Sequence, residues 1–192
     1  RDIAQALVSY YNFWGNANER MMANYLLGCV YRDLGDSPRA IDAYQTAISK
    51  ADTTNSNCDF YTLSSIYGQM ADVFYNELLL SKSIEARKHS SHYAYLAKDT
   101  FNAIFSLDKS TSAYILLDKR DSAEIILKNV RCWYLQNNYI QNALQSSTKM
   151  MLIYAQDTSK LSDTKQLIEE YEAKSDFLRN NHELPPVKRQ FY

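Results

Sequence analysis

Glycine and proline are scarce in this sequence, and their scarcity argues against a β-rich fold. The 192 residues include four glycines and three prolines. Pro185 and Pro186 lie near the end, so Pro38 is the single proline of residues 1–184. A β-rich protein of this size needs many tight turns, which draw on glycine and proline. The composition therefore favours helices joined by short polar loops.

A long apolar run and a strong net charge are also missing. No stretch of about 18 apolar residues occurs, so we predict no membrane insertion by this region. The formal net charge of −1 provides no general attraction for nucleic acid or for an anionic membrane surface. Nucleic acid is therefore not an expected partner.

Cysteine is too sparse for a disulfide framework. Cys29, Cys58 and Cys132 are odd in number, lie far apart and form no C-x-x-C motif. We expect Cys29 and Cys132 to be small buried side chains, as free cysteines commonly are. Exported proteins can also lack disulfides, so both the periplasm and the cytoplasm stay open as the compartment.

Motifs for catalysis and for cofactor or metal binding are absent from the sequence. The glycines stand apart at positions 15, 28, 35 and 68, so they form neither a dinucleotide fingerprint nor a phosphate-binding loop. His89 and His92 could share one helix face. A stable metal site needs three or four ligands, however, and their neighbours supply no good third one. We therefore predict no enzyme activity, no catalytic residue, no cofactor and no metal.

The most informative segment predicts two helices that meet across a tight turn. Apolar and small residues recur at helical spacing on both sides of the turn Gly35-Asp36-Ser37-Pro38. Ser37 can cap the second helix, and Pro38 fits its first turn, where the missing N–H costs nothing. Gly28 and Ala40 are small where the two helices must approach each other, and Tyr31 and Tyr44 are large and fill the space beside them.

This hairpin resembles the tetratricopeptide repeat (TPR), a unit of about 34 residues with L-G-x-x-Y in its first helix and A-x-x-x-F/Y-x-x-A in its second. A unit that starts at Met21 places the following residues on those positions: Leu27, Gly28, Tyr31, Ala40, Tyr44 and Ala47. Asn24 replaces the family's usual early aromatic residue, and Asp52 replaces its closing proline. The resemblance implies an all-α fold, namely a right-handed α-α superhelix of the TPR-like solenoid type.

Weaker copies of the pattern extend the array along the chain. A second unit can start at Ser64, after the polar run 52–59. A third can start at Ile104, although a competing phase places Tyr134 and Ala143 in register instead. We expect one array over 1–180 and an extended tail over 181–192, in a chain truncated from a longer one. About nine helices are predicted, over residues 2–14, 20–34, 37–50, 60–78, 81–97, 101–117, 120–136, 139–155 and 161–179.

The family resemblance also implies where a ligand would bind. In TPR arrays the first helix of each hairpin lines a concave groove, and the unit starts above imply these groove residues: Tyr25, Arg32, Asp72, Tyr75 and Asn76. We expect Arg32, Asp72, Tyr75 and Asn76 to be accessible, and Tyr31 and Phe74 to be buried. An alternative interpretation is that Arg32 and Asp33 simply pair with neighbours on a solvated face.

The predicted function is a TPR scaffold without catalytic activity that binds a protein or peptide in its groove. Two short strings, Tyr31-Arg32-Asp33-Leu34-Gly35-Asp36 and Tyr171-Glu172-Ala173-Lys174-Ser175, resemble segments of bacterial regulators. Those regulators carry TPR-like repeats ahead of a transmembrane helix and an output domain. The alternative function is therefore a ligand-sensing or dimerising region of a membrane-anchored signalling or transcription regulator, with a homodimer as a further partner.

Overall fold

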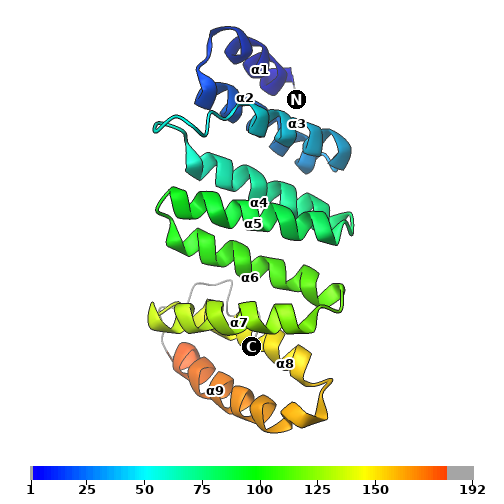
Figure 1. Cartoon of the computed structure of the whole chain (residues 1–192), viewed down its shortest axis with the longest axis vertical. Coiled ribbons are helices and arrows are strands. Elements are labelled where there is room, and N and C mark those ends of the chain that lie inside the picture. Colours follow the sequence, from blue (N-terminus) through cyan, green and yellow to red (C-terminus); the bar gives the residue numbers. More distant parts are fainter. Residues whose placement is uncertain (1, 181–192) are drawn as a thin grey trace. The chain divides into compact units, whose positions relative to one another are not determined.

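The computed structural model describes residues 2–180, and these residues form α-helices, one short 3-10 helix and no strand (Figure 1). The elements are α1 (Asp2–Trp14), α2 (Ala17–Asp33), α3 (Ser37–Lys50), α4 (Phe60–Asn76), α5 (Leu80–Leu96), α6 (Thr100–Leu116), α7 (Arg120–Gln136), α8 (Ile140–Tyr154), η1 (Thr158–Lys160) and α9 (Leu161–Asn180). The nine α-helices of this part of the chain confirm the all-α prediction, each within a few residues of its expected bounds. The predicted tail 181–192 lies outside the described residues.

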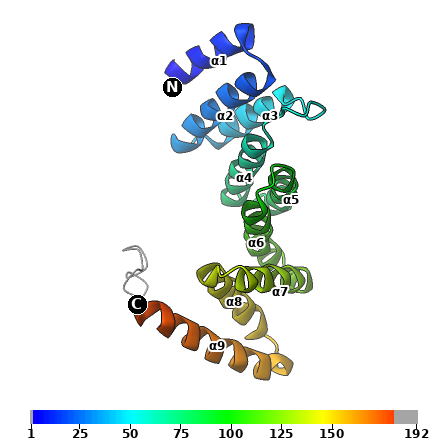
Figure 2. The ribbon, with the colours of Figure 1, turned by 90° about the vertical axis from the view of Figure 1, so that its left-hand side faces the viewer.

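The chain divides into two compact units, of which the first ends at Asp118 and the second begins at Lys119. In the first unit, helices α2 to α6 follow one another in a stack (Figure 1 and Figure 2). In the second unit, α7 and α8 form a hairpin and α9 packs on α8. Short turns make consecutive helices antiparallel neighbours, as in the predicted hairpins.

A strict spacing underlies helices α4 to α8. They begin at Phe60, Leu80, Thr100, Arg120 and Ile140, which is a period of 20 residues. A hairpin and its turns therefore take 40 residues, more than the family's unit of about 34. The two unit starts predicted at Ser64 and Ile104 differ by this same 40 residues.

Each of these turns ends its helix in the same way. Leu78, Lys98, Asp118 and Asn138 all adopt the left-handed conformation with φ of 56–63°, and Gly35 does so at 74°. After Gly35, Leu78, Lys98 and Asn138, the N–H of the following residue donates to the carbonyl five residues back, for example Leu79 to Phe74 at 2.8 Å and Asp99 to Ala94 at 2.9 Å. This bond satisfies a carbonyl that the helix end would otherwise leave without a partner.

Aspartate or asparagine side chains start several of the first unit's helices. Asn16 and Glu19 form a reciprocal capping box on α2. Asp59 and Asp99 accept the N–H groups of Thr62 at 2.9 Å and Asn102 at 3.0 Å, and so cap α4 and α6. The prediction that Ser37 caps α3 is wrong by one residue, because the Asp36 carboxylate reaches the N–H of Arg39 at 3.1 Å.

The core of the first unit contains a small-to-large contact between two of the predicted residues, Gly28 and Tyr44. Tyr44 is completely buried, and its ring lies so close to Gly28 that a Cβ there would be 2.5 Å from Cδ1. Tyr31 and Phe74 are each 7% exposed, which confirms that they point into the packed layer. Their burial fixes the rotation of α2 and α4, and therefore which residues these helices leave accessible.

The three cysteines are free, but their burial differs from the prediction. Cys29 is half-buried and accepts a hydrogen bond from the Tyr44 hydroxyl at 3.7 Å. Cys132 is exposed, so the expectation that it is a buried side chain is wrong. Val130 and Tyr134 occupy the buried face of α7, and the intervening Cys132 is turned away from that face.

Candidate functional site

The first unit contains a cleft of about 360 Å³ formed mainly by alternate helices of its stack. Helices α2, α4 and α6 contribute most of the lining, and α5 contributes part of the floor. We call this cleft the groove. Its lining residues are Tyr25 from α2; Tyr61, Ser64, Ser65, Gly68, Gln69 and Asp72 from α4; Arg87 and Ser90 from α5; and Asp99, Asn102, Phe105, Ser106 and Lys109 from α6 and its cap.

The structure brings three of the predicted site residues together at this groove. Tyr25 and Asp72 line it directly. Arg32 is next to it, because its Nη1 donates a hydrogen bond to the side-chain oxygen of the lining residue Gln69. Arg32 also pairs with the neighbouring Asp33 at 2.7 Å, which agrees with the alternative interpretation that these residues pair with neighbours.

The two other predicted residues lie at the end of α4, beyond the groove lining. Asn76 is exposed and Tyr75 is half-buried, so both have accessible surface as expected. Neither is among the residues that line the groove. Their place on the helix is one turn past Asp72, and their part in binding stays a prediction.

Sequence analysis missed the most unusual residue of the groove, Arg87. It is 6% exposed and forms an ion pair with Asp72, whose side chain is 53% exposed. Arg87 is the eighth residue of α5, and the residues at the same place in α3 and α7 are Tyr44 and Leu127, both completely buried. A cation at a position that is apolar in α3 and α7 is visible in the sequence, and it marks a candidate site because charged residues are rarely buried.

Small hydroxyl side chains make up the rest of the groove floor. The Ser64 hydroxyl donates to the Ser90 carbonyl at 2.8 Å, and the hydroxyls of Ser90 and Ser106 are 2.9 Å apart. All three serines are buried. They link α4, α5 and α6 where an apolar core is expected, so the floor of the groove is polar.

The walls of the groove combine aromatic rings with charged and amide groups. Burial, followed by the neighbouring Cys29, raises the pKa of Tyr25 to about 12, so its phenol remains a hydrogen-bond donor at neutral pH. The Lys109 ammonium lies 5.3 Å from the centre of the Phe105 ring. This arrangement offers stacking surfaces together with donors and acceptors.

Histidines and acidic groups do not gather into a metal site in the part of the chain that the structure describes. His89 and His92 are exposed, and the His89 ring stacks on Tyr67 with centroids 4.8 Å apart. Likewise, no helix within residues 2–180 is long and apolar enough to cross a membrane.

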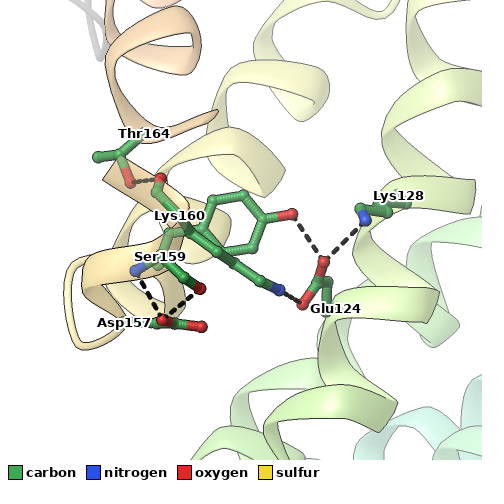
Figure 3. A network of polar contacts seen from close by, with 7 residues as sticks. Glu124, Lys128, Asp157, Ser159, Lys160 and Thr164 are labelled. Atoms are coloured by element: carbon green, nitrogen blue, oxygen red, sulfur yellow. Dashed lines mark hydrogen bonds and ion pairs between the residues drawn. The ribbon is translucent and has the colours of Figure 1, made fainter. Parts of the chain in front are cut away.

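The second unit contains a separate polar network around Glu124 (Figure 3). This buried carboxylate accepts hydrogen bonds from Tyr154 at 2.9 Å and Lys128 at 2.7 Å, and it pairs with Lys160. Burial alone would raise the pKa of Glu124, but these three donors outweigh it and lower the pKa to about 2. The network ties η1 to α7 and α8, so we assign it a structural role.

The chain matches no protein-family model, and no curated protein matches it in sequence. It does resemble solved structures in fold. The TPR-like repeats of a putative kinesin light chain from Podospora anserina are 12% identical, with a TM-score of 0.72 over 94% of this chain and 87% of that one. BtubC from P. vanneervenii is 14% identical, with a TM-score of 0.72 over 97% and 76% of the two chains.

The fold also resembles Rap-type bacterial proteins, although this chain spans less than half of their length. Aspartyl phosphate phosphatase F from Bacillus subtilis is 12% identical, with a TM-score of 0.72 over 94% of this chain and 46% of that one. The Rap conjugation gene regulator of plasmid pLS20, solved in complex with the Phr* peptide, is 13% identical, with a TM-score of 0.60 over 81% and 42%. The chain therefore has the same fold as these neighbours, that of the TPR-like helical repeat proteins.

Proposed function

We propose that this protein is a non-catalytic scaffold whose first unit binds a peptide segment of a partner protein in the groove. The observation that carries the proposal is the groove itself, a cleft of about 360 Å³ with a fixed polar floor and aromatic walls. Clefts with a few convergent polar groups and aromatic surfaces are the usual form of a ligand site. A structural neighbour, the pLS20 regulator, was solved with a peptide bound, which makes a peptide the first ligand to test.

The groups in the groove suit a peptide chain. Gln69 and Asn102 each carry an amide that can donate to and accept from backbone groups of a ligand. Tyr25, Tyr61 and Phe105 provide rings on which apolar or aromatic side chains can pack. Tyr75 and Asn76 extend this surface along α4, and Arg32 supports it through Gln69.

The chemistry of the lining favours binding over catalysis. No histidine or cysteine is among the residues that line the groove in the described part of the chain. Its buried serine hydroxyls bond to each other and to a backbone carbonyl, so none is paired with a base that would activate it.

The proposal is tested by selecting peptides from a displayed random library against the full chain, followed by calorimetric titration. Tyr25→Ala and Phe105→Ala should each weaken a selected peptide by about tenfold, because residues at the centre of an interface contribute most of the binding energy. Tyr95→Ala is a matched control, since Tyr95 lies on α5 with 70% of its surface exposed and does not line the groove. Selected peptides that bind both groove variants as tightly as wild type would contradict the proposal.

A further inference from the structure

Helix α5 has a buried arginine at the place where helices α3 and α7 have buried apolar side chains. Replacing a buried ion pair by apolar residues is often neutral or stabilising, so Arg87 is not explained by stability. Tyr44 and Leu127 pack without exposure at the same place in α3 and α7. A costly exception to the pattern, located under a groove, indicates a role in binding.

The guanidinium of Arg87 is oriented toward the groove with unused donors. Within residues 2–180 its one hydrogen bond goes from Nη2 to the Asp72 carboxylate. Arg87 lines the groove from below, through α5. A guanidinium has five N–H donors, so most of its capacity remains for a ligand.

Gly68 opens the groove floor to this guanidinium. A Cβ at residue 68 would lie 3.6 Å from Nη1 of Arg87 and 3.3 Å from the Ser90 hydroxyl. Any side chain larger than glycine would therefore stand between the guanidinium and a ligand in the groove. The absence of a side chain at residue 68 provides the access that a ligand needs.

We propose that Arg87 binds a carboxylate of the peptide, either an acidic side chain or the terminal carboxylate, and that Lys109 is its second cation. The inference rests on the proposed function, because it specifies what the groove recognises. Lys109 lies on α6, lines the same groove and pairs with no carboxylate in the described part of the chain. A guanidinium matches the planar geometry of a carboxylate, and the lysine adds a mobile charge.

The charge of the groove selects a carboxylate over a doubly charged phosphate. Arg87 and Lys109 contribute two positive charges, and Asp72 and Asp99 contribute two negative charges. Since Asp72 already partners Arg87, a ligand with one negative charge meets Lys109 and the free edge of the guanidinium without excess repulsion. A dianion would face the two aspartates with no surplus of positive charge.

The first experiment needs no peptide. The NMR signal of the Arg87 Nε–Hε group is followed while sodium acetate replaces sodium chloride at constant ionic strength. We expect a saturable shift for Arg87, and none for Arg39, which is exposed on α3. Equal and unsaturated shifts of both arginines would overturn the carboxylate site, even if peptides bind the groove.

The second experiment uses the peptides selected against the full chain. Changing the essential acidic residue to its amide, or amidating the terminal carboxylate, should weaken binding by about tenfold or more. Selected peptides that contain no acidic group needed for binding would overturn the inference and leave the proposed function intact. If no peptide is selected at all, the proposed function fails and the acetate titration alone decides the carboxylate site.

Variants separate binding from folding. Arg87→Leu copies Leu127 at the same helical position, so it should unfold at the same or a higher temperature than wild type while the acetate response is lost. Lys109→Gln, on an exposed side chain, should weaken acidic peptides severalfold, whereas Lys88→Gln on the exposed surface of α5 should not. Acidic peptides that bind wild type, Arg87→Leu and Lys109→Gln equally well would contradict the assignment.

Discussion

The same substitution at two glycines, in the first helices of neighbouring hairpins, should change the stability of the fold in different directions. Gly28 in α2 faces the ring of Tyr44, and its added Cβ would lie 2.5 Å from two ring atoms. Gly68 in α4 faces Ser90 and Arg87, and its added Cβ would lie at 3.3 and 3.6 Å. Gly28→Ala and Gly68→Ala therefore add one methyl group to helix interiors that differ in free space.

The magnitudes follow from two opposing effects. Alanine is more favourable than glycine in a helix interior by about 1 kcal/mol. Overpacking costs about 1–3 kcal/mol, and the upper part applies at Gly28 because the Tyr44 ring is completely buried and cannot move aside. We expect Gly28→Ala to lower the free energy of unfolding by about 1–2 kcal/mol. Gly68→Ala should be neutral or stabilise by up to about 1 kcal/mol, since the Ser90 hydroxyl can rotate.

Thermal unfolding followed by circular dichroism measures both effects. For a chain of this length, 1 kcal/mol corresponds to about 2–4 °C in Tm. Gly28→Ala should lower Tm by about 2–8 °C, and Gly68→Ala should leave it unchanged or raise it by up to about 4 °C. Gly28→Leu should lower Tm further than Gly28→Ala does, whereas Lys50→Ala should hardly change Tm. A Gly28→Ala protein as stable as wild type would refute the packing of α2 on α3.

Other predictions concern the turns and the second unit. Gly35 has a φ of 74°, so Gly35→Ala should lower stability by about 1 kcal/mol in urea unfolding, although nothing lies near its added Cβ. The carboxylate of Glu124 has its pKa lowered to about 2 in the folded state, so its contribution is present above about pH 5 and is lost as the pH falls toward 2. Glu124→Gln should therefore cost about 1–3 kcal/mol at pH 7 and almost nothing near pH 2. A stability difference between wild type and Glu124→Gln that does not change with pH would contradict the network in Figure 3.

Much of the fold could be predicted because its signals are local. The hairpin at Gly28 and Tyr44 contains its small-to-large contact within one short segment, so helical spacing reveals it. The 20-residue period was harder to see. Leu78 and Lys98 adopt a left-handed conformation that glycine usually marks, so residues without a turn signal end these helices.

The groove was predicted in part for a similar reason. Tyr25 and Asp72 follow from helix rotation once Tyr31 and Phe74 are known to be buried. Arg87 could not be placed in the same way, because it comes from the second helix of its hairpin and reaches the groove beside Gly68. The position of Arg87 at the groove depends on how α5 packs beneath α4, and the spacing of residues within one helix does not specify that packing.

Mapping a bound peptide on the protein tests the central claim most directly. Backbone amide signals of the isotope-labelled full chain are compared with and without a selected peptide. The account predicts that the largest shifts fall on α2, α4 and α6, around Tyr25, Gly68 and Lys109. Shifts concentrated instead on the opposite surface, around Tyr67 and His89, would contradict the claim that this groove binds the ligand.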